Sequence, residues 1–187
     1  MPARFTSEAR TISLLDVDPA FGNGVPDADL PQARRALSVP TAAVPSGDFD
    51  IGGVAARHGD TALLLVLSGA IARDVQVLDR ITSQLFGPGD LLAMSGGDAD
   101  SVNAKVRFHA EEPGRVALIN GRFHAAARVW PELSGLVQQR LAAQSRRLAV
   151  QAAILALPRV ENRVLAILWH LADVFGSVRS DGVLVPL

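Results

Sequence analysis

Between residue 38 and about residue 119 the chain consists of short apolar runs separated by turn residues, and this pattern limits the fold more than any other feature. The runs read SVPTAAV, TALLLVLSG, AIARDVQVL, RITSQLFGPGD, VNAKVRFHA and GRVALIN. Short β-type runs at spacings of about 8–12 residues, with Gly, Pro and Asp between them, are typical of an all-β barrel or sandwich. We therefore predict an antiparallel β-domain in this part of the chain.

Two positions in this stretch carry residues that are typical of tight turns. Ser68 and Gly69 join the apolar run LLLVL to the alternating run AIARDV, which indicates a β-hairpin at that point. Pro88 and Gly89 lie within FGPGDLL, and both residue types favour tight turns. The sequence thus predicts a hairpin at Ser68-Gly69 and a tight turn at Pro88-Gly89.

From residue 120 onward the pattern is helical. GRFHAAARVW suits a short helix, and Pro131 can begin the next one because a Pro in the first turn loses no hydrogen bond. Pro158 cannot lie inside that helix. We therefore predict a long helix over 131–157, of roughly 40 Å at 1.5 Å per residue.

The long helix has the spacing of a coiled-coil seam. Apolar and Gln side chains recur at alternating intervals of four and three residues, at Val137, Leu141, Gln144, Leu148, Gln151 and Leu155. Polar seam residues weaken a coiled coil but specify its register and partner number. We predict a homodimer interface along this seam, and the alternative is an amphipathic helix that packs on its own domain.

The two ends of the chain differ from the middle. Residues 1–37 are dense in Asp, Pro and Gly and then briefly helical at LPQARRAL.

Residues 158–187 contain a helix over 159–175 followed by a hairpin pattern, VRSDGVLVPL. That helix has an apolar stripe with no following element to bury it, at Val160, Val164, Ile167, Leu168, Leu171, Val174 and Phe175. An exposed apolar stripe of this kind indicates a missing partner.

Composition excludes several classes of protein. Apolar residues make up 49% and charged residues 20% of the chain, a globular balance. No apolar run reaches the roughly 18–20 residues of a membrane helix, and MPARFTSEAR lacks the apolar stretch of a signal peptide. We expect a cytoplasmic protein. Cysteine is absent, which excludes disulfides and Cys-ligated zinc or iron–sulfur sites.

The sequence offers no catalytic site. His58, His109, His124 and His170 lack metal-ligand spacing, and no P-loop, nucleophile elbow or dinucleotide glycine pattern occurs. Glu111 and Glu112 precede Pro-Gly, which favours a solvated turn over an acid–base pair. We therefore predict no enzyme activity, no catalytic residue and no metal site.

The chain resembles the Crp/Fnr family of bacterial transcription regulators in three features. These are a β-roll with LLLVLSG and FGPGDLL, a long dimer helix, and the C-terminal stretch RVENRVLAILWHLADVFGSVRSDGVLVPL. The resemblance begins at about residue 12. It implies an α+β fold: an antiparallel β-roll (a double-stranded β-helix, cupin-like), a long dimerisation helix and the start of a winged-helix domain. The implied domains are an N-terminal segment with a short helix (1–37), a β-roll sensor (38–130), the dimerisation helix (131–157) and an incomplete winged helix-turn-helix domain (158–187).

The resemblance also implies a function. Family members regulate transcription by binding DNA as homodimers, and in them the two helices of the helix-turn-helix follow a hairpin such as DGVLVPL. The expected protein is therefore the sensor and dimerisation portion of such a regulator, and its recognition helix would lie outside this chain. The alternative is a stand-alone β-roll that binds a small ligand or dimerises without DNA.

The sensor departs from the family in its phosphate-binding cassette. Cyclic-nucleotide binders carry a Gly-Glu pair and an Arg followed by a small residue, and the corresponding stretch here is LLAMSGGDADSVNAKVRFHAEEP. The Arg position falls at Ala104, with Lys105 in place of the small residue. The candidate ligand-binding residues that the resemblance implies are Ser95, Gly96, Gly97, Ala104, Lys105 and Gln151. The missing Arg argues against cAMP, so we expect no cofactor and either an unidentified small effector or none, with a cyclic nucleotide as the alternative.

Overall fold

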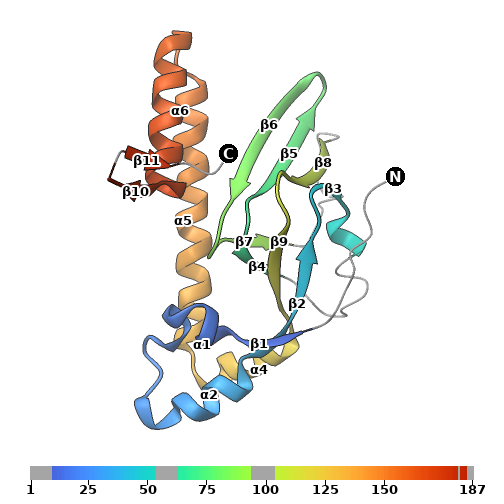
Figure 1. Ribbon diagram of the computed structural model, residues 1–187, viewed down its shortest axis with the longest axis vertical. Coiled ribbons are helices and arrows are strands. Elements are labelled where there is room, and N and C mark those ends of the chain that lie inside the picture. Colours follow the sequence, from blue (N-terminus) through green and yellow to red (C-terminus); the bar gives the residue numbers. More distant parts are fainter. Residues whose placement is uncertain (1–9, 54–62, 94–103, 181, 185–187) are drawn as a thin grey trace. The chain divides into compact units, whose positions relative to one another are not determined.

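The computed structural model describes residues 10–53, 63–93, 104–180 and 182–184, of which residues 177–179 are described by their backbone alone (Figure 1). The chain forms two compact units, Met1–Arg140 and Leu141–Leu187. The first unit contains two antiparallel sheets and several short helices, and the second consists of helix and a hairpin. The predicted α+β class is therefore confirmed.

The first unit contains a five-stranded and a four-stranded sheet. In the five-stranded sheet the order is β1 (Thr11–Ser13), β2 (Ser38–Val44), β9 (Gly114–Ile119), β4 (Leu63–Ser68) and β7 (Leu91–Ala93). In the four-stranded sheet the order is β3 (Gly47–Phe49), β8 (Ala104–Ala110), β5 (Ile71–Val77) and β6 (Arg80–Phe86). All paired neighbours are antiparallel. Each apolar run identified in the sequence contains one of these strands.

The hairpin predicted at Ser68-Gly69 is wrong. β4 pairs with β7 and β9, whereas β5 pairs with β6 and β8, so the turn carries the chain from one sheet into the other. Gly69 has φ +80°, and a Cβ built there would lie 3.0 Å from the Cα of Gly114 on β9. The β4–β9 register also shifts between Val66 and Ser68. This close approach and the shift redirect the strand, and neither can be seen in local sequence.

The tight turn at Pro88-Gly89 is present. Asp90 N–H donates to Gly87 O at 3.0 Å, and Gly89 has φ +89°. Pro followed by a positive-φ Gly is the signature of a type II turn. The buried Asp90 carboxylate accepts a further hydrogen bond from Gly87 N–H at 3.0 Å, which closes the turn.

An apolar cluster with members from both sheets forms one part of the core. Its buried residues are Ala42, Val44, Phe49, Ile51, Leu64, Val66, Ile71, Phe86, Leu92, Ala110, Val116 and Leu118, and Phe108 packs against them. Because strand residues alternate between faces, these positions define the inner face of each sheet.

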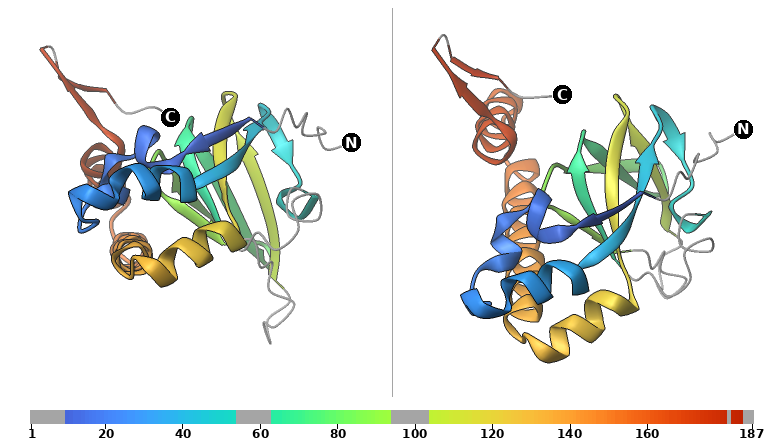
Figure 2. Two further views of the ribbon diagram at one scale, coloured as in Figure 1. Left: turned by 90° about the horizontal axis from the view of Figure 1, so that it is seen from below. Right: turned by 60° about the horizontal axis from the view of Figure 1, so that its bottom comes forward.

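A second cluster lies on the other face of the five-stranded sheet. The helices that contribute to it are α1 (Leu14–Val17), α2 (Leu30–Ala36), α4 (Gly121–Val129) and the first turns of α5 (Glu132–Leu155), with the 3₁₀ turns η1 (Pro19–Gly22) and η2 (Asp27–Asp29) nearby. Figure 2 shows α1, α2 and α4 gathered on one side of the strands. Phe21 and Phe123 meet edge to face in this cluster, with ring centroids 6.0 Å apart.

The second unit begins within α5. That helix ends at Leu155, two residues before the predicted boundary at Leu157, and α6 (Val160–Phe175) begins after Pro158. β10 (Ser177–Arg179) pairs antiparallel with β11 (Gly182–Leu184). No residue of α6 is buried. Its exposed large apolar side chains are Val160, Val164, Leu165, Leu168 and Trp169.

Arg140 connects three separate segments of the first unit. Its Nη2 lies 2.6 Å from Asp18 Oδ2, and its Nη1 donates to Gly89 O at 3.1 Å. Its Cζ lies 4.9 Å from the centroid of the Phe21 ring. The Arg140 and Asp18 side chains are 17% and 20% exposed, so solvent screens this pair less than an ordinary surface ion pair. Arg140 therefore joins α5 to the N-terminal segment and to the turn between β6 and β7.

We expect Arg140→Met to destabilise the first unit by about 2 kcal/mol, because it removes charged hydrogen bonds and leaves the mostly buried Asp18 without its cation. Arg34→Met is the matched control, since it breaks the Arg34–Asp16 pair at 3.1 Å, whose side chains are 61% and 54% exposed. The control should cost less than about 1 kcal/mol. Urea unfolding followed by circular dichroism measures both, and equal losses would contradict the role given to Arg140.

Candidate functional site

The two faces of the four-stranded sheet carry different chemistry. On β5, Ile71, Arg73, Val75 and Val77 alternate with the intervening residues, and the buried Ile71 shows that this set faces the inner cluster. Across the sheet, Arg73 is opposite Gln84 on β6 and Phe108 on β8. The next pairs in the same direction join Val75 to Thr82 and to Val106.

Arg73 brings a positive charge to this inner face. The guanidinium donates from Nη2 to Gln84 Oε1, and its Cζ lies 5.4 Å from the centroid of the Phe86 ring. Its Nε is buried without a hydrogen-bond partner. Within the residues that the structure describes, no carboxylate forms an ion pair with Arg73. Burial lowers the pKa of Arg73 from its usual value, because desolvation disfavours the charged form.

The surroundings of Arg73 are apolar. Phe108, directly opposite, has its ring centroid 6.1 Å from that of Phe49 on β3. Val75 is half-buried, and Val106 is 43% exposed. Around Arg73 the inner face therefore places one amide and several aromatic and aliphatic side chains, some of which are exposed.

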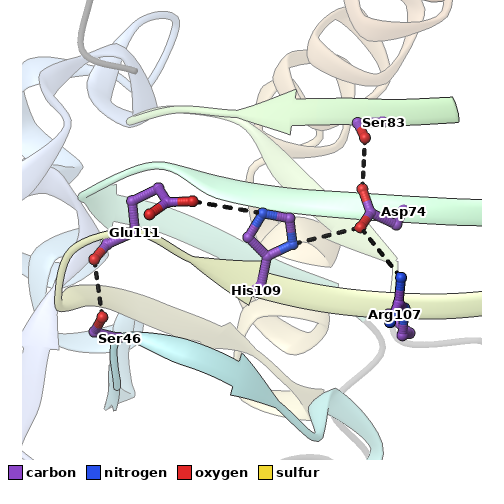
Figure 3. Close-up of polar contacts among 6 residues, drawn as sticks. All are labelled: Ser46, Asp74, Ser83, Arg107, His109 and Glu111. Carbon is purple, nitrogen blue, oxygen red and sulfur yellow. Dashed lines mark hydrogen bonds and ion pairs between the residues drawn. The ribbon is translucent and has the colours of Figure 1, made fainter.

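The outer face of the same sheet carries a polar cluster centred on Asp74 (Figure 3). Ser83 Oγ donates to Asp74 Oδ1 at 2.6 Å. His109 Nδ1 lies 3.6 Å and Arg107 Nη2 4.0 Å from Asp74 Oδ2. On its other side, His109 Nε2 lies 4.0 Å from Glu111 Oε1. The cluster thus links β5, β6 and β8 by contacts to one mostly buried carboxylate.

The hydrogen bonds of this outer cluster do not run from Ser to His to a carboxylate, as nucleophilic catalysis by a serine requires. Activation of a Ser requires its hydroxyl to donate to a base such as His. Here Ser83 donates to Asp74, and His109 contacts the other oxygen of that carboxylate. Glu111 has a side chain that is 78% exposed, in keeping with the solvated turn expected from the sequence. Among the described residues, no group of three or more His, Cys, Asp or Glu is placed to hold a metal ion.

The predicted ligand-binding residues are not brought together by the described part of the chain. Ser95, Gly96 and Gly97 lie outside the described residues. Ala104 is opposite Val77 on the inner face, whereas Lys105 is opposite Gln76 and therefore lies on the outer face. Lys105 and Arg73 thus lie on opposite sides of the sheet.

Gln151 and the other predicted seam residues lie on α5. Val137 packs against the cluster that the N-terminal helices cover, and Gln144 is buried, with 6% exposure. Gln151 is half-buried. Leu141, Leu148 and Leu155 are 38%, 37% and 47% exposed. These three leucines recur every seven residues and form an open row along the helix, which we call the leucine row.

Sequence reasoning missed Arg73, although a signal existed. In the run IARDVQV the residues at 71, 75 and 77 are apolar, and Arg73 has the same parity. A charged residue at a core-facing position of a strand is uncommon, because burying a charge costs free energy unless it is paired. Correct assignment of the faces would have identified Arg73 as a functional candidate.

No protein-family model matches the chain. No curated protein matches it either. Among solved structures, the chain is similar to a cyclic nucleotide-binding domain containing protein from Listeria monocytogenes EGD-e, with a TM-score of 0.60 and 16% sequence identity over 88% of this chain and 74% of that one.

The chain is also similar to a CooA mutant from Carboxydothermus hydrogenoformans, with a TM-score of 0.51 and 12% identity over 81% of this chain and 95% of that one. A structure of CprK complexed with OCPA has a TM-score of 0.48 and 16% identity, and the match covers 76% of this chain but only 64% of CprK. The chain thus spans less than two thirds of that protein. At these identities the likeness shows the fold, which is the β-roll fold of cyclic nucleotide-binding domains.

A search of the described ranges finds no helix that is both long enough and apolar enough to cross a membrane.

We expect cAMP and cGMP to leave the melting temperature of this chain unchanged. Ala104 cannot pair with a phosphate, and Lys105 lies on the face of β8 opposite the interior of the roll. A ligand present at 100 times its Kd would stabilise the fold by roughly 2.7 kcal/mol, which amounts to several degrees in a domain of this size. A thermal-shift assay measures this effect. A shift of several degrees would show that the altered cassette still binds a cyclic nucleotide.

Proposed function

We propose that this chain is the sensor and dimerisation portion of a DNA-binding transcription regulator of the Crp/Fnr type. The observation that carries the proposal is that a β-roll leads, through the short α4, into a 24-residue helix on which the leucine row remains open. An exposed leucine row along a helix of this length indicates a partner helix, which a β-roll that only binds a ligand does not require.

The proposed dimer forms through the leucine row. Leu141, Leu148 and Leu155 have the seven-residue spacing with which two helices supercoil around each other. Val150 is also exposed, but it lies about 200° around the helix from Leu148 and cannot join the same seam. The predicted seam residues Val137, Gln144 and Gln151 then flank the row.

In this proposal the β-roll senses a small effector and α6 begins a winged-helix domain. A winged-helix domain buries its first helix against the two helices of the helix-turn-helix, which would cover the apolar side chains exposed on α6, such as Leu165, Leu168 and Trp169. The β10–β11 hairpin follows α6 directly. In the proposed regulator, DNA would be read by a recognition helix that enters the major groove. The protein is thus proposed as a cytoplasmic regulator and not as an enzyme.

We expect the purified chain to be a homodimer at micromolar concentration and Leu148→Glu to make it monomeric, because a charge in the seam is costly to desolvate. Val150→Glu is the matched control, since it places the same charge at an exposed apolar position outside the row. The control should remain a dimer. Light scattering coupled to size-exclusion chromatography gives the mass. A monomeric mass near 19.7 kDa for the unmodified chain would remove the basis for a dimeric regulator.

The DNA-binding part of the proposal predicts the coding sequence. We expect the gene to continue beyond Leu187 for about 40 residues that contain two short helices joined by a Gly-centred turn, the size of a helix-turn-helix. Sequencing the gene and selecting DNA sequences that its full product binds would test this. A stop codon directly after Leu187, in a chain that still dimerises, would instead favour a stand-alone β-roll module.

A further inference from the structure

We propose that Arg73 on β5 binds the carboxylate of a small apolar acid at the inner face of the four-stranded sheet. The proposal rests on the proposed function, because it names the chemical class of effector for the β-roll sensor. It places the anion-binding group on β5, outside the stretch that corresponds to the phosphate-binding cassette.

The first argument is an uncompensated charge. Arg73 is half-buried, its Nε–H has no partner, and within the described residues its polar contact is a neutral amide, Gln84. A charge withdrawn from water is costly unless it is paired. A bound anion would supply the missing negative charge.

The second argument is that the guanidinium is already oriented. Gln84 Oε1 accepts from Nη2, and the ring of Phe86 lies under Cζ at 5.4 Å. Both contacts come from β6, the strand paired with β5, so they restrict the plane of the guanidinium before any ligand arrives. An Arg held in this way loses less conformational freedom on binding, and its planar fork suits the two oxygens of a carboxylate.

The third argument concerns the charge of the ligand. The other cation on this face of β5, β6 and β8 is Arg80, which is opposite Val77 and exposed. It lies four residues along β6 from Gln84, or about 13 Å at the rise of a β-strand. Across the interior, the five-stranded sheet presents buried apolar residues of β2, β4, β7 and β9 to the inner cluster. A single guanidinium matches a monoanion better than a phosphate dianion.

The fourth argument concerns the body of the ligand. Phe108 is directly opposite Arg73, and Val75 and Val106 are the next pair on the same face, with Val106 43% exposed. Covering such side chains with an apolar group is favourable. An aromatic or aliphatic acid could place its carboxylate at Arg73 and its body against these residues.

The test uses benzoate as the probe and benzamide, of nearly the same shape but without charge, as its control, at matched ionic strength. Benzoate should raise the melting temperature of the dimeric chain by a few degrees at millimolar concentration, and benzamide should not. Arg73→Met should abolish the response. Lys105→Met, which removes the cation on the opposite face of β8, should leave the response intact.

Ligand-free stability separates binding from a structural role. Met retains the unbranched stem of Arg73 and removes a half-buried charge, so Arg73→Met should melt at the same temperature as the unmodified chain or higher. A lower melting temperature would assign Arg73 to folding and overturn the proposal.

A direct readout does not depend on that variant. In chain labelled with 15N-arginine, the Nε–H signal of Arg73 is identified by its loss in Arg73→Lys. It should move with benzoate and stay in place with benzamide. An unmoved signal, or a larger shift with inorganic phosphate than with benzoate, would overturn the carboxylate assignment.

The two proposals can fail separately. A chain that is dimeric but does not respond to benzoate leaves the regulator proposal in place and removes the anion site. A chain that binds benzoate through Arg73 but is monomeric keeps the anion site and removes the dimeric regulator.

Discussion

The apolar cluster that β-strands from both sheets build is the constraint on which the first unit depends. Its residues belong to eight strands and to the segment after β3, and each of these strands turns at least one apolar side chain toward it. The opposite face of the four-stranded sheet is then free to be polar, as the contacts around Asp74 show. Arg73 interrupts the apolar set on the inner face of β5, where its Nε is buried without a hydrogen-bond partner. The same alternation that builds the core therefore also identifies the candidate site.

Arg140 has a comparable role for the helices. It contacts Asp18 and the Phe21 ring in the N-terminal segment and Gly89 in the turn between β6 and β7. These contacts position the start of α5 on the cluster that the N-terminal helices cover. Beyond Arg140 the leucine row remains exposed. The helix is thus attached at one end to the β-roll unit and carries an open apolar row at the other, and this arrangement underlies the proposed dimer.

Much of the strand layout could be predicted, because alternation and turn residues act locally. β2 coincides with the run SVPTAAV, and the turn at Pro88-Gly89 forms as expected. The hairpin at Ser68-Gly69 failed because Gly69 meets Gly114, a residue far along the chain. The site was less predictable. The family resemblance implied Ala104 and Lys105 as ligand-binding residues, but they lie on opposite faces of β8. Arg73 was overlooked because the faces of β5 depend on its pairing with β6 and β8.

The sequence by itself determined the order of the elements: short strands over residues 38–119 and helices after them, because periodicity and turn chemistry depend only on near neighbours. It also determined the leucine spacing of α5. Only the tertiary structure decided that β4 and β5 enter different sheets, that Gln84 and Phe86 lie beside Arg73, and that Arg140 contacts Gly89. The contacts of Gly69 with Gly114 and of Arg140 with Gly89 join residues far apart in the chain, and Gln84 meets Arg73 only through the register in which β5 and β6 pair.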